Sequence, residues 1–284
     1  MKLLNLGCGT RYHQAWTNLD FVSSNENVIS HNLLQGIPFT DNSFDVVYHS
    51  HVLEHFSRSD GRKFIEECFR VLKPNGIFRI AVPNLERIVR EYLKNLELAL
   101  QGNENAANNY DWIKLELYDQ VVRNESGGDM AKYLFQQHIP NEEYVFERIG
   151  EEGRNLRKAH FHNIHQRESV NEAWQKNNKI SIQAKLIIRN TRLTIKKIFF
   201  KKQIKEFEKL QKEVAIGRFR LGGEIHQWMY DRYSLTRLLA ETGFIHIEVK
   251  DAFSSGIPGW NEYELEAKSG TIFKPDSLFM EAVK

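Results

Sequence analysis

The sequence predicts an α/β protein in which a doubly wound, mostly parallel sheet is interrupted by a large helical insertion. Three observations support this class. Short apolar runs alternate with helical or turn segments over residues 1–85, helical spacing dominates residues 86–220, and the alternation returns over residues 221–284. We therefore expect residues 1–85 and 221–284 to form one sheet domain. Residues 86–220 would form a helical insertion that serves as a lid, a substrate wall or a docking arm.

Composition excludes several classes of protein. Of the 284 residues, 41% are apolar, which is enough for a core and excludes a disordered chain. No run approaches the roughly 18 apolar residues that a membrane span requires. The two cysteines, Cys8 and Cys68, exclude a disulfide scaffold and a cysteine-based zinc site. A reducing, cytoplasmic setting is therefore expected.

The first 85 residues contain four strand candidates and one helix. The strand candidates are short apolar runs bounded by turn residues: Lys2–Leu6, Thr17–Phe21, Phe44–His49 and Ile77–Val82. Between the last two, apolar residues over 60–72 recur at helical spacing, and Pro and Gly follow within four residues. Strands separated by crossovers predict a parallel sheet with helices on both faces.

Beyond this region the pattern changes twice. Residues 86–220 contain a single proline, Pro140, and mostly helical periodicity. From Leu221 onward the sequence predicts a helix over Tyr233–Thr242 and strands over Phe244–Val249 and Ser277–Val283. These elements complete the sheet domain.

A candidate ligand site follows the first strand. Gly7-Cys8-Gly9 places two residues without a side chain at the carboxyl end of that strand, where a backbone can approach a ligand closely. An ordinary tight turn would have the same composition. Asp20 closes the second strand, where a carboxylate can accept hydrogen bonds from both hydroxyls of a ribose, although it could equally cap a turn.

Four motifs in this order resemble the class I S-adenosylmethionine-dependent methyltransferases: Leu4–Gly9, Pro38–Val47, Val52–His55 and Val71–Gly76. The resemblance covers residues 1–85. It implies a Rossmann-like fold with an antiparallel last strand and S-adenosylmethionine as cofactor. The implied cofactor contacts are Asn5, Gly7, Cys8 and Gly9 at the glycine turn, Asp20 at the ribose, Asn32 and Leu33 at the adenine, and Ser50 beside the sulfonium.

The chain departs from the family pattern at three places. Asn5 replaces the usual Asp, and Arg11 stands where a third Gly is common. Only the ten residues of Thr10–Leu19 separate Gly9 from Asp20, so the first helix of the family is expected to be short or missing. This spacing resembles a bacterial subgroup of shortened methyltransferases that is often implicated in surface-glycan pathways.

Methyl transfer to a hydroxyl usually requires a general base, and histidine is the natural choice near neutral pH. His51, just past the strand over 44–49, and His226 are the catalytic candidates. Glu54 and His55 are expected to begin a helix or to support the site from behind. An amine acceptor would only need to be uncharged.

Trp228, Tyr230 and Asp231 follow His226 closely and are candidate substrate residues. Aromatic rings here could stack on a sugar, or they could pack the insertion against the sheet domain. The cluster His160–His165 lacks a carboxylate or cysteine at ligand spacing, so no metal site is expected.

Residues 185–220 carry 12 basic and 3 acidic side chains, although the net charge of the whole chain is only +2. Such a helix could lie on an anionic membrane surface, or it could dock its apolar face on the sheet domain or on a second subunit, as in a homo-oligomer. Nucleic-acid binding is not expected, because the rest of the chain is neutral or acidic.

These features favour an O-methyltransferase that acts on a sugar of a surface glycan or its precursor, a substrate class that rests on the subgroup resemblance alone. A small-molecule or N-methyltransferase is the alternative within the enzyme class. A scaffold protein that keeps the fold without the chemistry is the alternative outside it, as is a subunit that docks to a complex through its basic helix.

Overall fold

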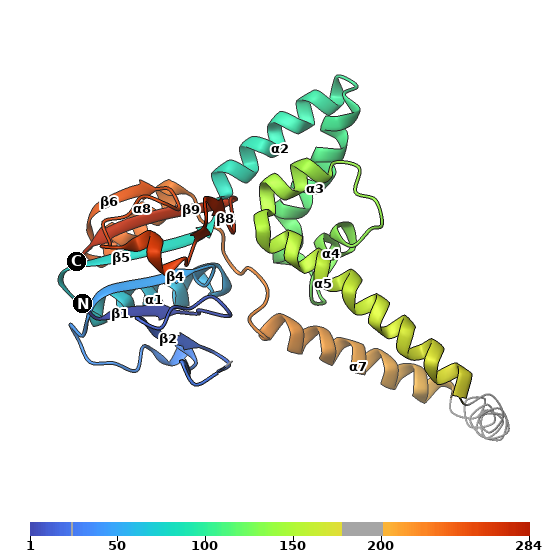
Figure 1. Ribbon diagram of the computed structural model, residues 1–284, viewed down its shortest axis with the longest axis horizontal. Helices are drawn as coiled ribbons and strands as arrows, with labels where there is room; N and C mark the ends of the chain where they lie inside the picture. Colours follow the sequence, from blue (N-terminus) through green and yellow to red (C-terminus); the bar gives the residue numbers. More distant parts are fainter. Residues whose placement is uncertain (24, 178–200) are drawn as a thin grey trace. The chain divides into compact units, whose positions relative to one another are not determined.

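A computed structural model describes residues 1–23, 25–177 and 201–284 of the chain. Its centre is a seven-stranded sheet with the strand order β3-β2-β1-β4-β5-β9-β6 (Figure 1). The strands are β1 (Leu3–Leu6), β2 (Thr17–Asp20), β3 (Val28–Ser30), β4 (Phe44–Ser50), β5 (Leu72–Pro83), β6 (Ile245–Lys250) and β9 (Ser277–Val283).

The first five strands are parallel, and β9 lies antiparallel between β5 and β6. The strand order reverses between β1 and β4, which marks the switch point at which doubly wound sheets bind their ligands. The predicted Rossmann-like class with an antiparallel last strand is therefore confirmed. Residues 10–16 between β1 and β2 form turns and no helix, as their short length predicted.

Helices cover one face of the sheet. α1 (Arg58–Val71) begins at Ser57, whose side chain accepts a hydrogen bond from the Asp60 amide, and α8 (Arg232–Thr242) ends at Gly243. Apolar side chains of both helices pack on the sheet residues that alternate onto this face. The buried core residues contributed by the two helices are Phe64, Ile65, Cys68, Val71, Leu235 and Leu239.

The opposite face differs from the prediction, which placed helices on both. Trp16 and a loop that contains the short 3₁₀ helix η3 (Trp260–Tyr263) cover Leu3, Val46 and Tyr48 there. Because the connection from β1 to β2 is too short for a helix, irregular chain and aromatic rings fill the space that a helix would occupy.

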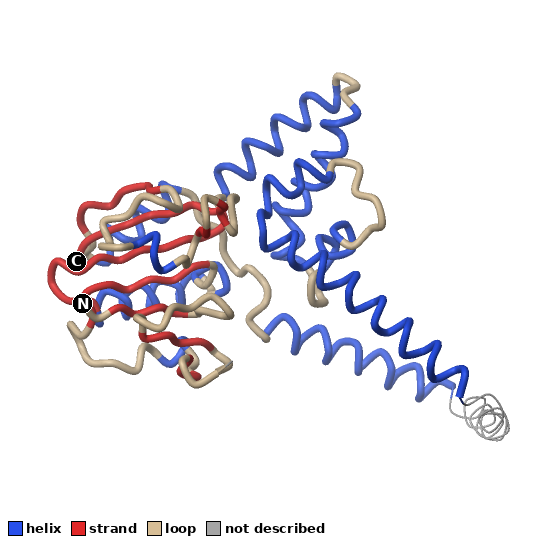
Figure 2. Tube along the Cα trace, in the orientation of Figure 1, coloured by secondary structure: helices blue, strands red, loops and turns tan. Residues whose placement is uncertain are grey.

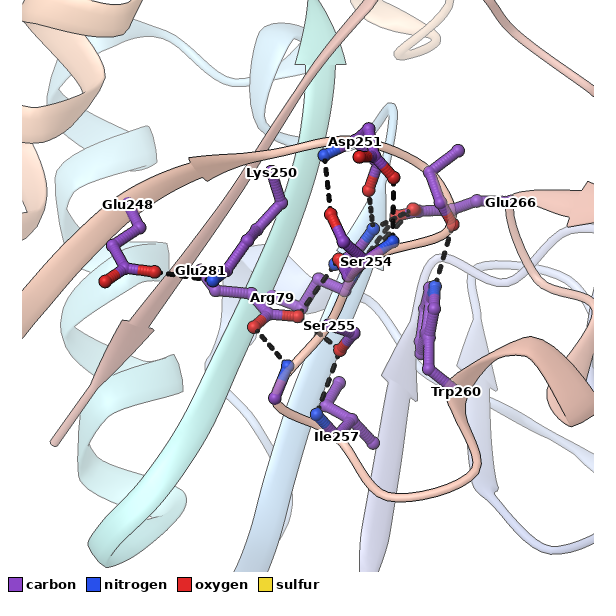
Figure 3. A network of polar contacts seen from close by, with 12 residues as sticks. Arg79, Glu248, Lys250, Asp251, Ser254, Ser255, Ile257, Trp260, Glu266 and Glu281 are labelled. Atoms are coloured by element: carbon purple, nitrogen blue, oxygen red, sulfur yellow. Dashed lines mark hydrogen bonds and ion pairs between the residues drawn. The ribbon is translucent and has the colours of Figure 1, made fainter.

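A buried ionic network fixes this loop to the sheet (Figure 3). Arg79 on β5 donates to the carboxylate of Glu266, to Glu281 on β9 at 2.7 Å and to the backbone oxygen of Ser254 at 2.9 Å. Its guanidinium also lies 4.3 Å from the ring centroid of Trp260. Two carboxylates thus share one guanidinium in a site closed to water.

The other α-helices in the described residues, blue in Figure 2, are α2 (Leu85–Leu100), α3 (Glu104–Val122), α4 (Gly128–Leu134), α5 (Glu142–Asn177) and α7 (Lys201–Leu221). α5 is interrupted at Gly150, whose φ of 62° breaks the helical path. Two small strands, β7 (Ala267–Lys268) and β8 (Thr271–Ile272), pair with each other.

The chain divides into two compact units. One contains Met1–Arg123, Gly127–Arg154 and Ile225–Lys284, and the other contains Asn124–Ser126 and Asn155–Glu224. α2, α3, α4 and the start of α5 thus belong to the same compact unit as the sheet. The expected division into residues 1–85 with 221–284 and residues 86–220 stays a prediction.

Helix α7 carries the described part of the basic segment, and residues 185–200 lie outside the described residues. Along α7 the apolar side chains of Phe207, Leu210 and Val214 are exposed at 59%, 56% and 44%. Among the described helices none is both long enough and apolar enough to cross a bilayer.

Candidate functional site

The loop after β1 has the backbone geometry that a ligand turn requires. Gly7 and Gly9 both have left-handed φ angles, of 64° and 54°. A Cβ at Gly7 would lie 2.3 Å from Cγ2 of Val52, so this glycine allows two segments to meet. A Cβ at Gly9 would meet no atom of the described residues within 4 Å. The backbone at Gly9 is therefore open to a ligand.

Asp20 lies directly against this loop. Its Oδ2 accepts a 2.7 Å hydrogen bond from the amide of Gly9, and its Oδ1 accepts one of 3.3 Å from the amide of Val22. The carboxylate is thereby held at the carboxyl ends of β1 and β2, beside the open position at Gly9. It retains further lone pairs for the two hydroxyls of a ribose.

The two substituted residues of the family pattern, Asn5 and Arg11, contact other residues of the chain through hydrogen bonds and an ion pair. The amide of Asn5 is buried and donates to Oδ1 of Asn18 and to the backbone oxygen of Arg11. Its side chain thus holds the loop, and the expected cofactor contact at Asn5 stays a prediction. Nη2 of Arg11 lies 3.0 Å from Oε2 of Glu152, and its guanidinium lies 4.0 Å above the Phe273 ring.

The other predicted cofactor residues lie at the same sheet edge. Asn32 caps the 3₁₀ helix η1 (Leu33–Gln35) after β3, and its side chain accepts from the amide of Leu34. Cys8 is buried, and burial raises the pKa of its thiol to about 11, so the thiol is neutral at physiological pH. Ser50 ends β4, the central strand beside β1.

His51 follows β4 with a φ of 55°, which is rare for a residue other than glycine. Its Nδ1 lies 3.1 Å from Oε1 of Glu54, and its Nε2 lies 2.8 Å from Oγ of Ser277. Ser277 is the first residue of β9 and pairs with Pro83 at the end of β5. Because β9 is antiparallel, its start lies at the carboxyl edge, where it meets His51.

Glu54 lies on the 3₁₀ helix η2 (Leu53–His55), together with His55. The segment containing His226 is tied to this helix by its backbone, because the amides of Gln227 and Trp228 donate to the backbone oxygen of Glu54 at 2.7 and 3.2 Å. Glu54, His55 and His226 each offer one atom that can bind a metal, and these three atoms lie within 4.8 Å of one another. Sequence spacing alone did not predict this group.

Burial and the contact with His51 together set the charges of these groups. Burial by itself raises the pKa of the fully buried Glu54, but the hydrogen-bond contact with His51 outweighs it and holds the pKa well below its usual range. Burial lowers the pKa of His226 to about 3. An ionised carboxylate therefore lies beside a neutral imidazole, and His226 is a weaker proton acceptor than expected for a general base.

Two of the three expected substrate residues have structural roles. Tyr230 is only 3% exposed and belongs to the helix-covered core, whereas Asp231 caps α8 through a 2.7 Å hydrogen bond from the amide of Ser234. Trp228, at 41% exposure, presents a ring to solvent, and the guanidinium of Arg58 lies 5.4 Å from it. Trp228 and Tyr230 nevertheless line one pocket together, and a substrate role for Trp228, Tyr230 and Asp231 stays a prediction.

The helical part of the same compact unit contains a polar cavity of about 270 Å³. α2, α3 and α5 form it. Amide, carboxylate and guanidinium groups dominate its lining, and these groups include Glu91, Asn95, Asn103, Asn109 and Arg148. Such groups can both donate to and accept from hydroxyls.

Local pattern offered little sign of the residues that the prediction missed. Ser277 begins the predicted strand over Ser277–Val283, but only the antiparallel pairing of that strand brings it to His51. Glu152 lies in the helical region and pairs with both Arg11 and Lys274, at 3.0 and 3.5 Å. Neither contact could be inferred from spacing, because 141 and 226 residues separate the partners.

Comparison with known proteins agrees with the opening motifs. Residues 4–80 match a family model described as a methyltransferase domain. A stretch of 56 residues is 45% identical to a protein of Mycolicibacterium smegmatis named "Probable S-adenosylmethionine-dependent methyltransferase". That stretch covers 20% of this chain and 21% of the relative, so the chain spans about a fifth of the relative's length.

Solved structures give more distant likenesses. A SAM-dependent methyltransferase from Thermotoga maritima is 10% identical, with a TM-score of 0.39 over 100% of this chain and 82% of that one. One from Archaeoglobus fulgidus is 10% identical, with a TM-score of 0.35 over 100% and 86%. TM-scores below 0.5 support no functional conclusion. The methyltransferase domain signature of this chain therefore lies in residues 4–80, the segment that forms β1 to β5.

Proposed function

We propose that the protein is an S-adenosylmethionine-dependent methyltransferase. The observation that carries the proposal is the open backbone at Gly9 beside Asp20, at the switch point between β1 and β4. A ribose would bind the carboxylate, and the methionine part of the cofactor would follow the glycine turn. Methyl transfer from a sulfonium is an in-line displacement, so the protein mainly has to orient and desolvate the acceptor.

The residues present fit this cofactor. S-adenosylmethionine supplies an electrophilic methyl group when bound. The chain would supply Asp20 for the ribose, Asn32 and Leu33 beside the adenine, and Ser50 near the reacting end. His51 is the candidate proton acceptor: Glu54 keeps the proton on Nδ1, so Nε2 carries the lone pair, and the acceptor hydroxyl would take the place of Ser277 Oγ at that nitrogen.

A sugar hydroxyl of a surface glycan or its precursor is our proposed acceptor. Two features support oxygen over nitrogen as the methylated atom: the oriented imidazole of His51 and the polar cavity of α2, α3 and α5. An amine would need no such base. Small-molecule methylation remains the alternative, since the 270 Å³ cavity also suits a single sugar-sized ligand.

Calorimetry with S-adenosylmethionine and its demethylated product tests cofactor binding directly. We expect both to bind, and Asp20→Ala to weaken binding about 10- to 100-fold through the loss of charge-assisted hydrogen bonds. Asp41→Ala is a matched control on an exposed carboxylate that pairs with Arg70. If the wild-type protein binds neither compound, the chain is a scaffold and the proposal fails.

We also propose that α7 contacts an anionic membrane surface. Phe207, Leu210 and Val214 recur at helical spacing with exposed side chains, and lysines accompany them along the helix. Apolar residues would enter the acyl boundary while the lysines reach the headgroups. Such contact would bring the enzyme to lipid-linked glycan precursors.

A further inference from the structure

The group of Glu54, His55 and His226 has the composition of a transition-metal site. Two imidazoles and one carboxylate are a common ligand set for Zn²⁺ and Fe²⁺, and they leave a coordination position open. The three ligand atoms lie within 4.8 Å of one another. Ligands about 2.0–2.2 Å from a tetrahedral ion are ~3.3–3.6 Å apart, so binding requires a contraction of about 1 Å.

Two buried polar atoms of this group lack a partner in the described part of the protein. Glu54 is completely buried, His226 is 4% exposed, and neither Oε2 of Glu54 nor Nδ1 of His226 has a hydrogen-bond partner among the described residues. A buried polar atom without a partner is destabilising. A bound cation would satisfy both atoms at once.

Neighbouring groups orient the ligands as the surroundings of metal sites commonly do. Nδ1 of His55 lies 3.2 Å from the backbone oxygen of Ile225. A carbonyl only accepts, so Nδ1 carries the proton and the lone pair of Nε2 stays free for a metal. Nδ1 of His51 lies 3.1 Å from Oε1 of Glu54, which leaves Oε2 of the carboxylate as the ligand atom.

The two segments that carry the ligands are fixed before any metal binds. Besides the backbone hydrogen bonds to Glu54, Nε2 of Gln227 donates to the backbone oxygen of His55 at 2.9 Å. The amide of His226 donates to the backbone oxygen of Gln120 on α3 at 2.9 Å. Only side-chain rotations are therefore needed to close the site.

We propose that Glu54, His55 and His226 bind one divalent transition-metal ion, with zinc as the best match to two imidazoles and a carboxylate. The ion would keep one coordination position for water or for an oxygen of a substrate. In the reaction proposed above, that position would receive the acceptor hydroxyl and lower its pKa. This consequence rests on the proposed function, whereas metal binding itself does not.

Metal binding is tested on the full-length protein after chelator treatment and without cofactor. We expect one equivalent of Co²⁺ to give the visible absorption of a low-coordinate site with nitrogen and oxygen ligands, and Zn²⁺ to displace it. Glu54→Gln and His226→Gln should each weaken Zn²⁺ binding at least 100-fold. His51→Gln, which replaces the ring that orients Glu54 but removes no ligand, should weaken it about 10- to 100-fold.

A variant with His160→Gln and His162→Gln is the matched control. These histidines lie two apart on α5, where side chains point in different directions, so the variant should bind like the wild type. The thermal midpoint of the wild-type protein gives a second measurement, because Zn²⁺ should raise it and should leave that of Glu54→Gln unchanged.

The proposal is overturned if the wild-type protein binds neither ion, or if binding persists in Glu54→Gln and His226→Gln. Loss of metal binding only in the control variant with His160→Gln and His162→Gln would also overturn the proposal. Cofactor calorimetry on the metal-free protein is a separate measurement. A failure there, with metal binding intact, would contradict the methyltransferase proposal alone.

Discussion

Nδ1 of His51 lies 3.1 Å from Oε1 of Glu54, while Nε2 of the same ring lies 2.8 Å from Oγ of Ser277. The ring is thus held from both sides, by a residue three positions away and by one 226 positions away. Its backbone is held as well, because its amide donates to the backbone oxygen of Ala81 on β5. The imidazole is therefore fixed at the end of β4, where the reacting end of a cofactor would lie.

Replacing His51 tests the role of this fixed ring. If it accepts a proton from the acceptor, His51→Ala should lower kcat by about 100-fold or more, with little change in KM. Ser277→Ala removes one orienting contact worth about 1 kcal/mol, so kcat should fall about fivefold. Steady-state kinetics with the identified acceptor measures both. A kcat for His51→Ala equal to that of the wild type would eliminate the base role.

The two glycines of the β1 loop should respond differently to substitution. Gly9→Ala should weaken cofactor binding at least tenfold and cost only about 1 kcal/mol of stability, because its Cβ meets open space but its φ is left-handed. Gly7→Ala should destabilise the fold by about 2–4 kcal/mol, since its Cβ would overlap Val52.

Urea unfolding and cofactor calorimetry separate these two effects. Val52→Ala in the Gly7→Ala background should recover part of the lost stability, because it removes the overlapping methyl groups. Unchanged cofactor affinity in Gly9→Ala would show that the ligand does not approach this backbone, against our assignment of the turn.

The network around Arg79 predicts a pH-dependent stability. Burial raises the pKa of Glu266 from its ordinary 4.5 to about 7. The charge of Arg79 lowers this pKa and that of Glu281 raises it, but burial has the largest effect. A folded-state pKa above the unfolded value means that the protonated form is favoured by folding. Protonation of Glu266 therefore adds about 3 kcal/mol to the free energy of unfolding below pH 4.5. This stabilisation is lost as the pH rises through 7.

Glu266→Gln should therefore flatten the fall in unfolding free energy between about pH 5 and pH 8. Urea denaturation of both proteins across this range provides the measurement. Arg79→Met should cost about 3–5 kcal/mol at pH 8, since it leaves two buried carboxylates without their cation. Parallel pH curves for the wild type and Glu266→Gln would contradict the assigned pKa shift.

Membrane contact through α7 predicts sedimentation with anionic vesicles at low salt and its loss at high salt. Phe207→Ser with Leu210→Ser should reduce binding more than tenfold, because each apolar side chain contributes about 1.5–3 kcal/mol on burial. Lys209→Gln and Lys212→Gln should each reduce it about fivefold. Neutral vesicles are the control. Absence of sedimentation at low salt would exclude this role.

The sequence by itself determined the strands of the sheet along the chain, except β3 (Val28–Ser30), and the position of the glycine turn. Apolar runs such as Leu3–Leu6 and Ser277–Val283 alternate with helical spacing, and such local periodicity depends only on neighbouring residues. Gly7, Gly9 and Asp20 were predictable for the same reason, since the ends of parallel strands meet at one edge.

Tertiary structure alone decided how the histidines, Glu54 and the aromatic residues are used. Packing made Tyr230 a core residue and Asp231 a helix cap, and burial made His226 a neutral imidazole that is only weakly basic. The meeting of His226 with Glu54 and His55 depends on hydrogen bonds between segments 170 residues apart. Spacing along a chain carries no information about such contacts, because only the packed core fixes which distant backbones lie side by side.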